Sequence, residues 1–305
     1  MTKEKRKAAL FMVIAAFFYA LMAAMVKSID GIPVFEMLFF RTAFGSVFII
    51  VLMLKRHISF KGVNKTGLFF RGLTGFIADA FYFISITKIL LAETVTITNT
   101  YPFIVVLLSA LFLREKIKRH HFIALILCFT GALLIIRPGF CVFNFDYIYA
   151  ILTSIFIAIT YTILKKVRET DPAEIVVLYF SVMTTLLSIP FMVFGQFVLP
   201  DAGQLAQLMA LGVVGTVYQW FVSTAYKYAP ASEISIYSYT SIVFSSVMGI
   251  VFWDEYPVLA TIAGMTAIIS GAFVIFKKDS RPPKDSPADE EIKEDEISSS
   301  EIEKD

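Results

Sequence analysis

Two ionisable side chains stand out because they lie well inside largely apolar stretches of this sequence. Arg41 falls within the run 34–54 and Asp79 within the run 68–86. A charge at the centre of a membrane-spanning helix costs at least about 2.5 kcal/mol, so such residues mark ion or solute pathways. Arg41 could bind an anionic group of a solute or hold Asp79. Asp79 could bind an ammonium group or exchange a proton.

Depth along the two runs places these residues at a similar level. Each lies seven residues from the same boundary of its run, and helices rise about 1.5 Å per residue, so both are roughly 10 Å deep. We therefore predict an ion pair between Arg41 and Asp79. Two simpler interpretations stay open: the pair only fixes helix packing, or Arg41 only extends toward the headgroups.

Hydroxyl and amide side chains gather in the first halves of two later runs, 93–113 and 231–252. They offer hydrogen-bond donors and acceptors to a solute. The same groups could instead bond helix to helix, at about 0.6 kcal/mol each. Together with the ion pair and two tyrosines of other runs, the candidate solute-binding residues are Arg41, Asp79, Tyr82, Asn99, Tyr101, Tyr218, Tyr237, Tyr239 and Ser241. The acidic residues expected to be structural or gating are Glu93, Glu115, Glu233 and Glu255.

Enzyme chemistry finds little support in the sequence. The three histidines, His57, His120 and His121, fall in polar connections, and neither HExxH nor GxSxG occurs. No Walker A motif is present, so ATP is not the expected energy source. We predict that the chain is not an enzyme, holds no cofactor or metal and has no nucleic-acid partner.

The elements that must position these side chains are apolar helices. The chain is 57% apolar and 17% charged, with a mean hydropathy of +0.74, whereas soluble proteins are about 25% charged. A bilayer core needs about 20 apolar helical residues. The sequence therefore predicts an all-α integral membrane protein with ten transmembrane helices, at 8–26, 34–54, 68–86, 93–113, 120–137, 147–166, 174–198, 205–226, 231–252 and 257–276.

Lysines and arginines set the expected orientation. Basic groups in alternate connections mark the cytoplasmic side, and the other side carries only Lys27, Lys88 and Arg137. We expect both termini, 1–7 and the acidic tail 278–305, to face the cytoplasm from the inner (cytoplasmic) membrane. The tail's composition is typical of disorder.

The two halves of the chain resemble each other at an offset of about 139 residues. Pro33 meets Pro172, and Ala92 meets Ala231. Each half, 8–138 and 147–277, holds five predicted helices, and an odd number means that the second repeat is inverted relative to the first. Inverted repeats recur in secondary transporters, with the solute held where the halves meet.

The same offset pairs Arg41 with Phe180 and Asp79 with Tyr218. An inverted half can therefore pack without ionised groups at these positions, so the shared helix scaffold does not require the charged pair. That difference favours a functional role for Arg41 and Asp79.

Several short motifs resemble those of the EamA family of the drug/metabolite transporter superfamily. They are the stretch 35–41 ending in Arg41, Arg71-Gly72, Pro102 followed by 111–115, and Arg137-Pro138-Gly139. The second half departs from the first, with Ser241 where the first has Pro102.

The resemblance implies a secondary, non-ATP transporter that moves a small organic metabolite, such as an amino acid, by alternating access. Its partners would be the solute, the lipid bilayer and a coupling proton, and it could work as a monomer or homodimer. Two alternatives stay open: a flippase or exporter of lipids or hydrophobic compounds, and a membrane protein without a transport role.

Overall fold

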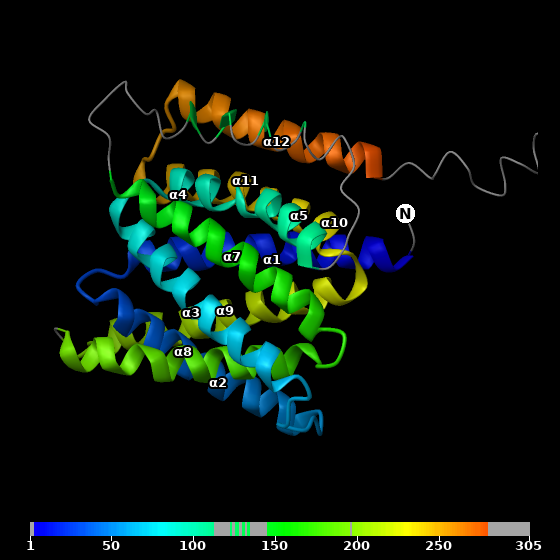
Figure 1. Cartoon of the computed structure of the whole chain (residues 1–305). Coiled ribbons are helices and arrows are strands. Elements are labelled where there is room, and N and C mark those ends of the chain that lie inside the picture. Colours follow the sequence, from blue (N-terminus) through cyan, green and yellow to red (C-terminus); the bar gives the residue numbers. More distant parts are fainter. Residues whose placement is uncertain are drawn as a thin grey trace, which may run out of the picture.

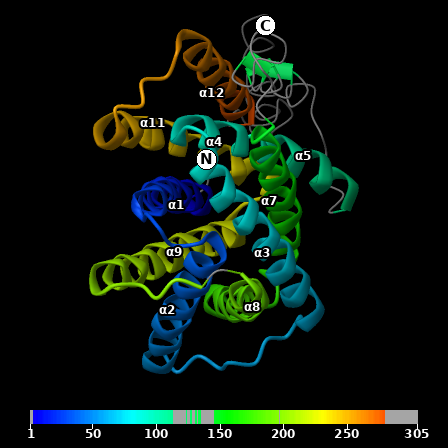
Figure 2. The same cartoon turned by 90° about the vertical axis from the view of Figure 1, so that its left-hand side faces the viewer.

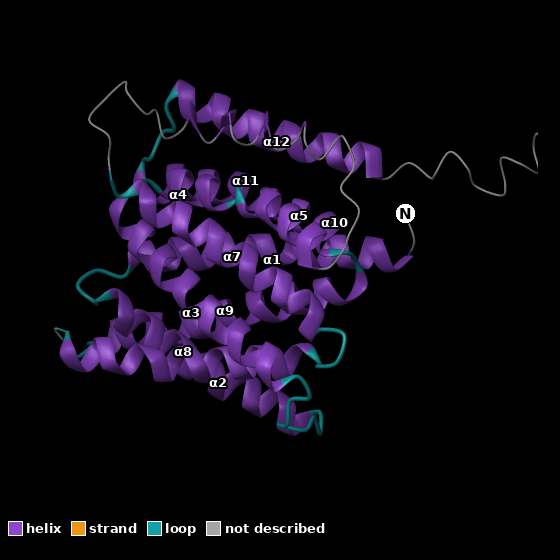
Figure 3. Cartoon of the chain, in the orientation of Figure 1, coloured by secondary structure: helices purple, strands orange, loops and turns teal. Residues whose placement is uncertain are grey.

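The computed structural model describes residues 3–112, 145–195 and 197–279, with 123, 126–127, 130–131 and 133–134 between the first two ranges. Helices and loops make up this part of the chain, and no strand occurs in it (Figure 3). Most of the predicted span 120–137 and nearly all of the tail 278–305 lie outside the described residues.

Apolar helices of spanning length dominate the fold, as predicted. Among the described residues seven helices are long and apolar enough to cross a membrane, if Leu91–Phe112 is counted as one helix. Tyr237–Trp253 and Leu259–Gly271 are shorter apolar helices. The elements are α1 (Lys3–Ser28), α2 (Val34–Lys55), α3 (Lys65–Lys88), α4 (Leu91–Thr98), α5 (Tyr101–Phe112), α7 (Tyr147–Val167), α8 (Ala173–Phe194), α9 (Ala202–Tyr228), α10 (Ala231–Ile234), the 3-10 helix η1 (Ser235–Tyr239), α11 (Thr240–Trp253) and α12 (Leu259–Asp279).

Two predicted spans are interrupted rather than continuous. The span 93–113 divides into α4 and α5, because Pro102 cannot donate a hydrogen bond to the carbonyl of Thr98. The span 231–252 divides into α10, η1 and α11, where Ser238 and Ser241 bond carbonyls three residues earlier. Such local side-chain bonds compete with the helical pattern.

Contacts made by helices of one half correspond to contacts made by helices of the other. The contact of α3 with α7 corresponds to that of α9 with α1, and the contact of α2 with α9 corresponds to that of α8 with α3 (Figures 1 and 2). Helices α2 and α8 also pack on each other. Contact between α2 and α9 is close because Gly45 faces Gly212 and Thr216. Small residues allow such close approach between membrane helices.

The start of α1 and the end of α12 lie at the same end of the helical bundle (Figure 1). We call this end the N-terminal end and the other the opposite end. Helix α1 therefore ends, and α12 begins, at the opposite end.

Candidate functional site

The predicted ion pair is present and buried. Arg41 Nη1 donates to Asp79 Oδ2 at 2.6 Å, and the two side chains are 2% and 13% exposed. Gly215 of α9 makes room for this arginine, because a Cβ there would lie 2.6 Å from Arg41 Nε. The rings of Phe83 and Phe180 flank the guanidinium at 5.4 and 5.9 Å. The pair thus links α2 to α3 inside the bundle.

A second arginine, Arg71 of α3, lies in the same buried region. Its Nη2 donates to Gln219 Oε1 at 2.6 Å, and its guanidinium stacks 4.3 Å from the centre of the Phe180 ring. Its Nε and Nη1 are buried and have no hydrogen-bond partner among the described residues. Arg71 is therefore a buried cation with incomplete pairing.

Sequence reasoning gave Arg71 no place in the site, because the helix was expected to begin only at residue 68. Helix α3 begins at Lys65, so Arg71 lies in its second turn, and its side chain is buried. One signal was available: Arg71, Gly75, Asp79 and Phe83 recur every four residues, a spacing that places them along one side of a helix.

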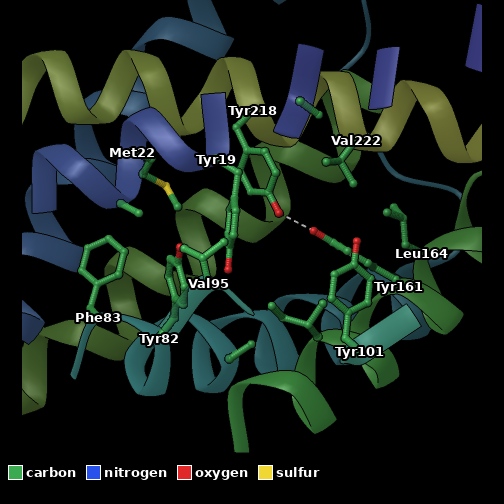
Figure 4. Packing of buried hydrophobic residues seen from close by; sticks show 14 of the residues in the cluster. Tyr19, Met22, Tyr82, Phe83, Val95, Tyr101, Tyr161, Leu164, Tyr218 and Val222 are labelled. Atoms are coloured by element: carbon green, nitrogen blue, oxygen red, sulfur yellow. Dashed lines mark hydrogen bonds between the residues drawn. The ribbon is translucent and has the colours of Figure 1, made fainter. Parts of the chain in front are cut away.

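Tyrosine rings from several helices form a buried cluster (Figure 4). Tyr19 stacks on Tyr82 with ring centres 4.8 Å apart and lies 5.2 Å from Tyr218. The hydroxyls of Tyr218 and Tyr161 are hydrogen-bonded to each other, and Tyr101 meets Tyr161 edge to face. Such rings combine apolar area with a polar hydroxyl.

A small internal cavity lies among these tyrosines, where the two interrupted helices meet. Its volume is about 10 Å³, close to the room that one water molecule needs. Asn99 Nδ2, at the end of α4, donates to Ser241 Oγ of α11 at 2.9 Å. The lining residues are Met12, Ala15, Ala16, Tyr19, Asn99, Tyr101, Ile157, Tyr218, Val222, Ser238 and Ser241.

The structure brings most of the predicted site residues together. Four of them line the cavity: Asn99, Tyr101, Tyr218 and Ser241. Tyr82 stacks beside it, next to the ion pair of α2 and α3. Tyr237 and Tyr239 are not among the lining residues, and the ring of Tyr239 packs instead 5.9 Å from that of Phe103.

Other polar groups of α4 and the following turn bond helix to helix. Ser85 donates to Thr94, and Thr100 bonds Ser154 at 2.7 Å. Glu93 accepts hydrogen bonds from the hydroxyls of Tyr147 and Thr261. These groups therefore contribute to packing, the alternative left open for them.

A wide vestibule of about 1060 Å³ opens at the opposite end of the bundle. It lies among the ends of α1, α3 and α11 and the start of α4. Beside it, Glu255 pairs with Lys27 and also accepts a hydrogen bond from the backbone N–H of Leu91 at 3.0 Å. One carboxylate thus joins three chain segments at the vestibule.

At the N-terminal end, the end of α7 and the loop that follows it form hydrogen bonds with the end of α9 and with the α2–α3 loop. Lys165 donates to the carbonyl of Ala229 at 2.9 Å, and Arg168 donates to that of Ser223 at 2.7 Å. Asp171 accepts hydrogen bonds from two backbone N–H groups of the α2–α3 loop, at 2.7 and 3.0 Å. Burial lowers the pKa of Arg168, while nearby carboxylates oppose that shift.

In the described part of the chain, no three His, Cys, Asp or Glu side chains gather into a group that could hold a metal ion. The buried groups are suited instead to binding. Two guanidinium groups can hold anions, one carboxylate can hold a cation, and the tyrosines can hold apolar or aromatic surface.

Comparison with known proteins gives a consistent pattern over both halves of the chain. The pattern of the EamA-like transporter family matches residues 6–137 and again residues 144–277. A crystal structure that is 20% identical in sequence has a similar fold, with a TM-score of 0.74 over 91% of this chain and 100% of that one.

Several curated relatives are transporters by name. The pseudopaline exporter CntI of Pseudomonas aeruginosa is 32% identical, over 85% of this chain and 92% of its own. An uncharacterized transporter of Helicobacter pylori is 29% identical over 84% of this chain and 90% of its own. The S-adenosylmethionine uptake transporter of Rickettsia prowazekii is 25% identical over 80% and 83%.

Proposed function

This chain belongs to the EamA-like transporter family, and we propose that it is a secondary carrier of a small organic metabolite across the cytoplasmic membrane. The family and its named relatives favour a transporter over an enzyme. One of these relatives is named as an exporter and another as an uptake transporter, so kinship alone does not set the direction of transport.

The meeting of Asn99 and Ser241 at the internal cavity carries this proposal. Interrupted helices of two halves that meet in this way are typical of solute sites in secondary transporters. We place the solute at the cavity, against Tyr101 and Tyr218, with Arg41 and Asp79 beside it. Tyr82 stacks on the cavity-lining Tyr19, whereas Tyr237 and Tyr239 do not line the cavity.

Alternating access is supported by the exchange of packing partners between the helices. The contact between α1 and α9 corresponds to the contact between α7 and α3. If the two repeats are inverted, the halves could exchange their arrangements and so convert one conformation into the one related to it by the pseudo-two-fold axis. We propose that the vestibule faces the outside, which places both termini in the cytoplasm. On this scheme the conformation described is wide at the outer end and closed at the inner end.

A central cavity of about 10 Å³ is too small for an organic solute. Binding therefore requires the tyrosine rings to separate. Tyr19 lines the cavity and stacks on Tyr82, so separation of these two rings would enlarge it. Polar groups at the cavity favour a polar metabolite over a lipid or hydrophobic compound.

Mass spectrometry of intracellular and extracellular metabolites tests the proposal. Cells that overproduce the wild type would be compared with cells that make Asp79→Asn at equal membrane abundance. Asp201→Asn is the matched control, since Asp201 is an exposed helix cap and asparagine caps equally well.

We expect the wild type and the Asp201→Asn control to redistribute the same solute and Asp79→Asn to leave it unmoved. Redistribution of a lipid or hydrophobic compound would favour the flippase alternative. If no solute changed with any variant, the transport proposal would be wrong for this chain.

A further inference from the structure

We propose that Arg71 binds a carboxylate group of the transported solute, so that the solute is an organic anion or a zwitterion. The inference rests on the proposed transport function and deepens it by naming the chemical class of the solute. It assigns the anion to Arg71 rather than to Arg41, whose guanidinium already pairs with Asp79.

The hydrogen bonds of Arg71 are incomplete. A guanidinium has five N–H groups, and among the described residues only Nη2 donates to an acceptor, the amide oxygen of Gln219. The single N–H of Nε and the two of Nη1 are buried without a partner among the described residues. Buried polar groups in native proteins are nearly always satisfied, so an acceptor that is absent here would complete the site.

Charge in the buried region is also unbalanced. Arg41 and Arg71 contribute two positive charges and Asp79 one negative charge, which leaves a net +1 among these three groups. Glu36, another buried ionisable group of α2, lies in the first turn of that helix and accepts a hydrogen bond from the backbone N–H of Val198. A bound monoanion would neutralise that charge. Carboxylates fit guanidinium edges well, because their two oxygens accept charge-assisted hydrogen bonds.

Phe180 and Gly75 surround the unpaired edge of Arg71. The ring of Phe180 covers one face of the guanidinium at 4.3 Å. Gly75 lies next to Nη1, and a Cβ there would be 3.2 Å from Nη1 and 2.9 Å from Phe180. The ring of Phe180 thus covers one face of the guanidinium, and even a Cβ at position 75 would crowd that ring and Nη1, so an acceptor at this edge requires Phe180 to shift.

A purely structural role of Arg71 and an anion-binding role predict opposite effects of its replacement on stability. If Arg71 served only to tie α3 to α9 through Gln219, its loss would destabilise the empty protein. If its charge awaits an anion, Arg71→Gln removes an unneutralised buried cation and keeps an amide that can bond Gln219. The empty variant should then be at least as stable as the wild type.

Thermal unfolding of the purified full chain in lipid nanodiscs, under one set of conditions, separates these roles. The probe is the small-molecule extract of the cells in which the protein is made, used untreated and after methyl esterification of its carboxylates. Arg71→Gln is compared with Arg71→Lys and with Arg6→Gln, which removes one charge from an exposed position.

We expect the untreated extract to raise the unfolding midpoint of the wild type and Arg6→Gln by about 2 to 6 °C. Esterified extract should give no rise, Arg71→Gln should not respond, and Arg71→Lys should respond in part because it keeps the charge without the planar fork. Without extract, the midpoint of Arg71→Gln should equal or exceed that of the wild type.

The proposal is overturned if esterified extract stabilises the wild type equally, if Arg71→Gln still responds, or if empty Arg71→Gln unfolds earlier or fails to fold. It is also overturned if untreated extract stabilises nothing. A failure here that leaves metabolite redistribution intact rejects the carboxylate assignment alone. Failure in both experiments rejects transport as well.

Discussion

The second and third helices of the two halves form the same packing with different chemistry. Helices α2 and α3 bring Arg41, Arg71 and Asp79 into the buried centre, whereas α8 and α9 contribute Phe180 and Tyr218 at the positions that the repeat pairs with Arg41 and Asp79. Each set still packs on its corresponding partners. The scaffold therefore forms with rings at these positions in one half and charges in the other, so packing alone does not require the charges.

A ring of the aromatic half also contacts both arginines of the charged half. Phe180 lies 5.9 Å from the Arg41 guanidinium and 4.3 Å from that of Arg71. Cation–π contacts of this kind hold a cation without neutralising it. The positive charges of Arg41 and Arg71 are therefore not cancelled by their contacts with Phe180.

Loss of the Arg41–Asp79 ion pair should have the largest effect on transport and stability. Asp79→Asn leaves Arg41 buried without its carboxylate, so we expect transport to fall below about a tenth of the wild-type rate and stability to fall by roughly 3 kcal/mol. Transport of the identified solute into vesicles and chemical unfolding in detergent measure the two effects.

The double variant Arg41→Met/Asp79→Leu separates function from packing. Replacing a buried pair by apolar residues of similar size is often neutral for stability. We expect it to regain stability without regaining transport. A stable double variant that transports normally would show that the charged half matters no more than the aromatic half.

Gly215→Ala should have the next largest effect, because its Cβ would press on Arg41 Nε at 2.6 Å. Overpacking of this kind costs about 1 to 3 kcal/mol, and displacement of Arg41 should slow transport. Val213→Ala, at an exposed position on the same helix, is the control for unfolding and transport. Equal behaviour of the two variants would mean that Arg41 can move without consequence.

Tyr218→Phe tests the aromatic half directly. The change removes the hydroxyl that bonds Tyr161 and lines the cavity, which should cost about 1 kcal/mol and weaken apparent solute affinity roughly fivefold. Tyr256→Phe, an exposed position, should leave the concentration dependence of transport unchanged. A larger loss than that of Asp79→Asn would reverse the ranking of the two halves.

Arg56→Gln should have the smallest effect. Arg56 pairs with Glu174 at 3.2 Å, but its side chain is 50% exposed. Exposed ion pairs contribute between about 0 and 1 kcal/mol, so unfolding and transport should stay close to wild type. A large loss would mean that burial does not separate the ion pairs of this chain into functional and peripheral ones.

Sequence reasoning reached the helical class, most helix positions and the Arg41–Asp79 pair, because depth along an apolar helix can be counted in residues. It missed Arg71, since the depth of that residue depends on where α3 begins, a boundary that apolar composition does not define. The ten-helix count and the inverted repeat stay predictions, as the span 120–137 lies mostly outside the described residues.

Side-chain geometry within the site was less accessible. Asn99 and Ser241 were both candidates, but their hydrogen bond depends on how α4 and α11 cross, a tertiary property. Tyr237 and Tyr239 have the same composition signal as Tyr101, yet the short 3-10 turn rotates them away from the cavity lining. Periodicity based on a continuous helix cannot anticipate that rotation.

If the chain works as the proposed carrier, the net positive charge of Arg41, Arg71 and Asp79 would make its reorientation sensitive to the membrane potential. A membrane potential of 100 mV acts with about 2.3 kcal/mol on each elementary charge moved fully across the bilayer. Reorientation of the empty site would move up to one such charge, whereas a site that holds a monoanion would reorient without net charge movement. A potential that is negative inside would then hold the empty site toward the cytoplasm, and voltage would set the resting orientation of the carrier.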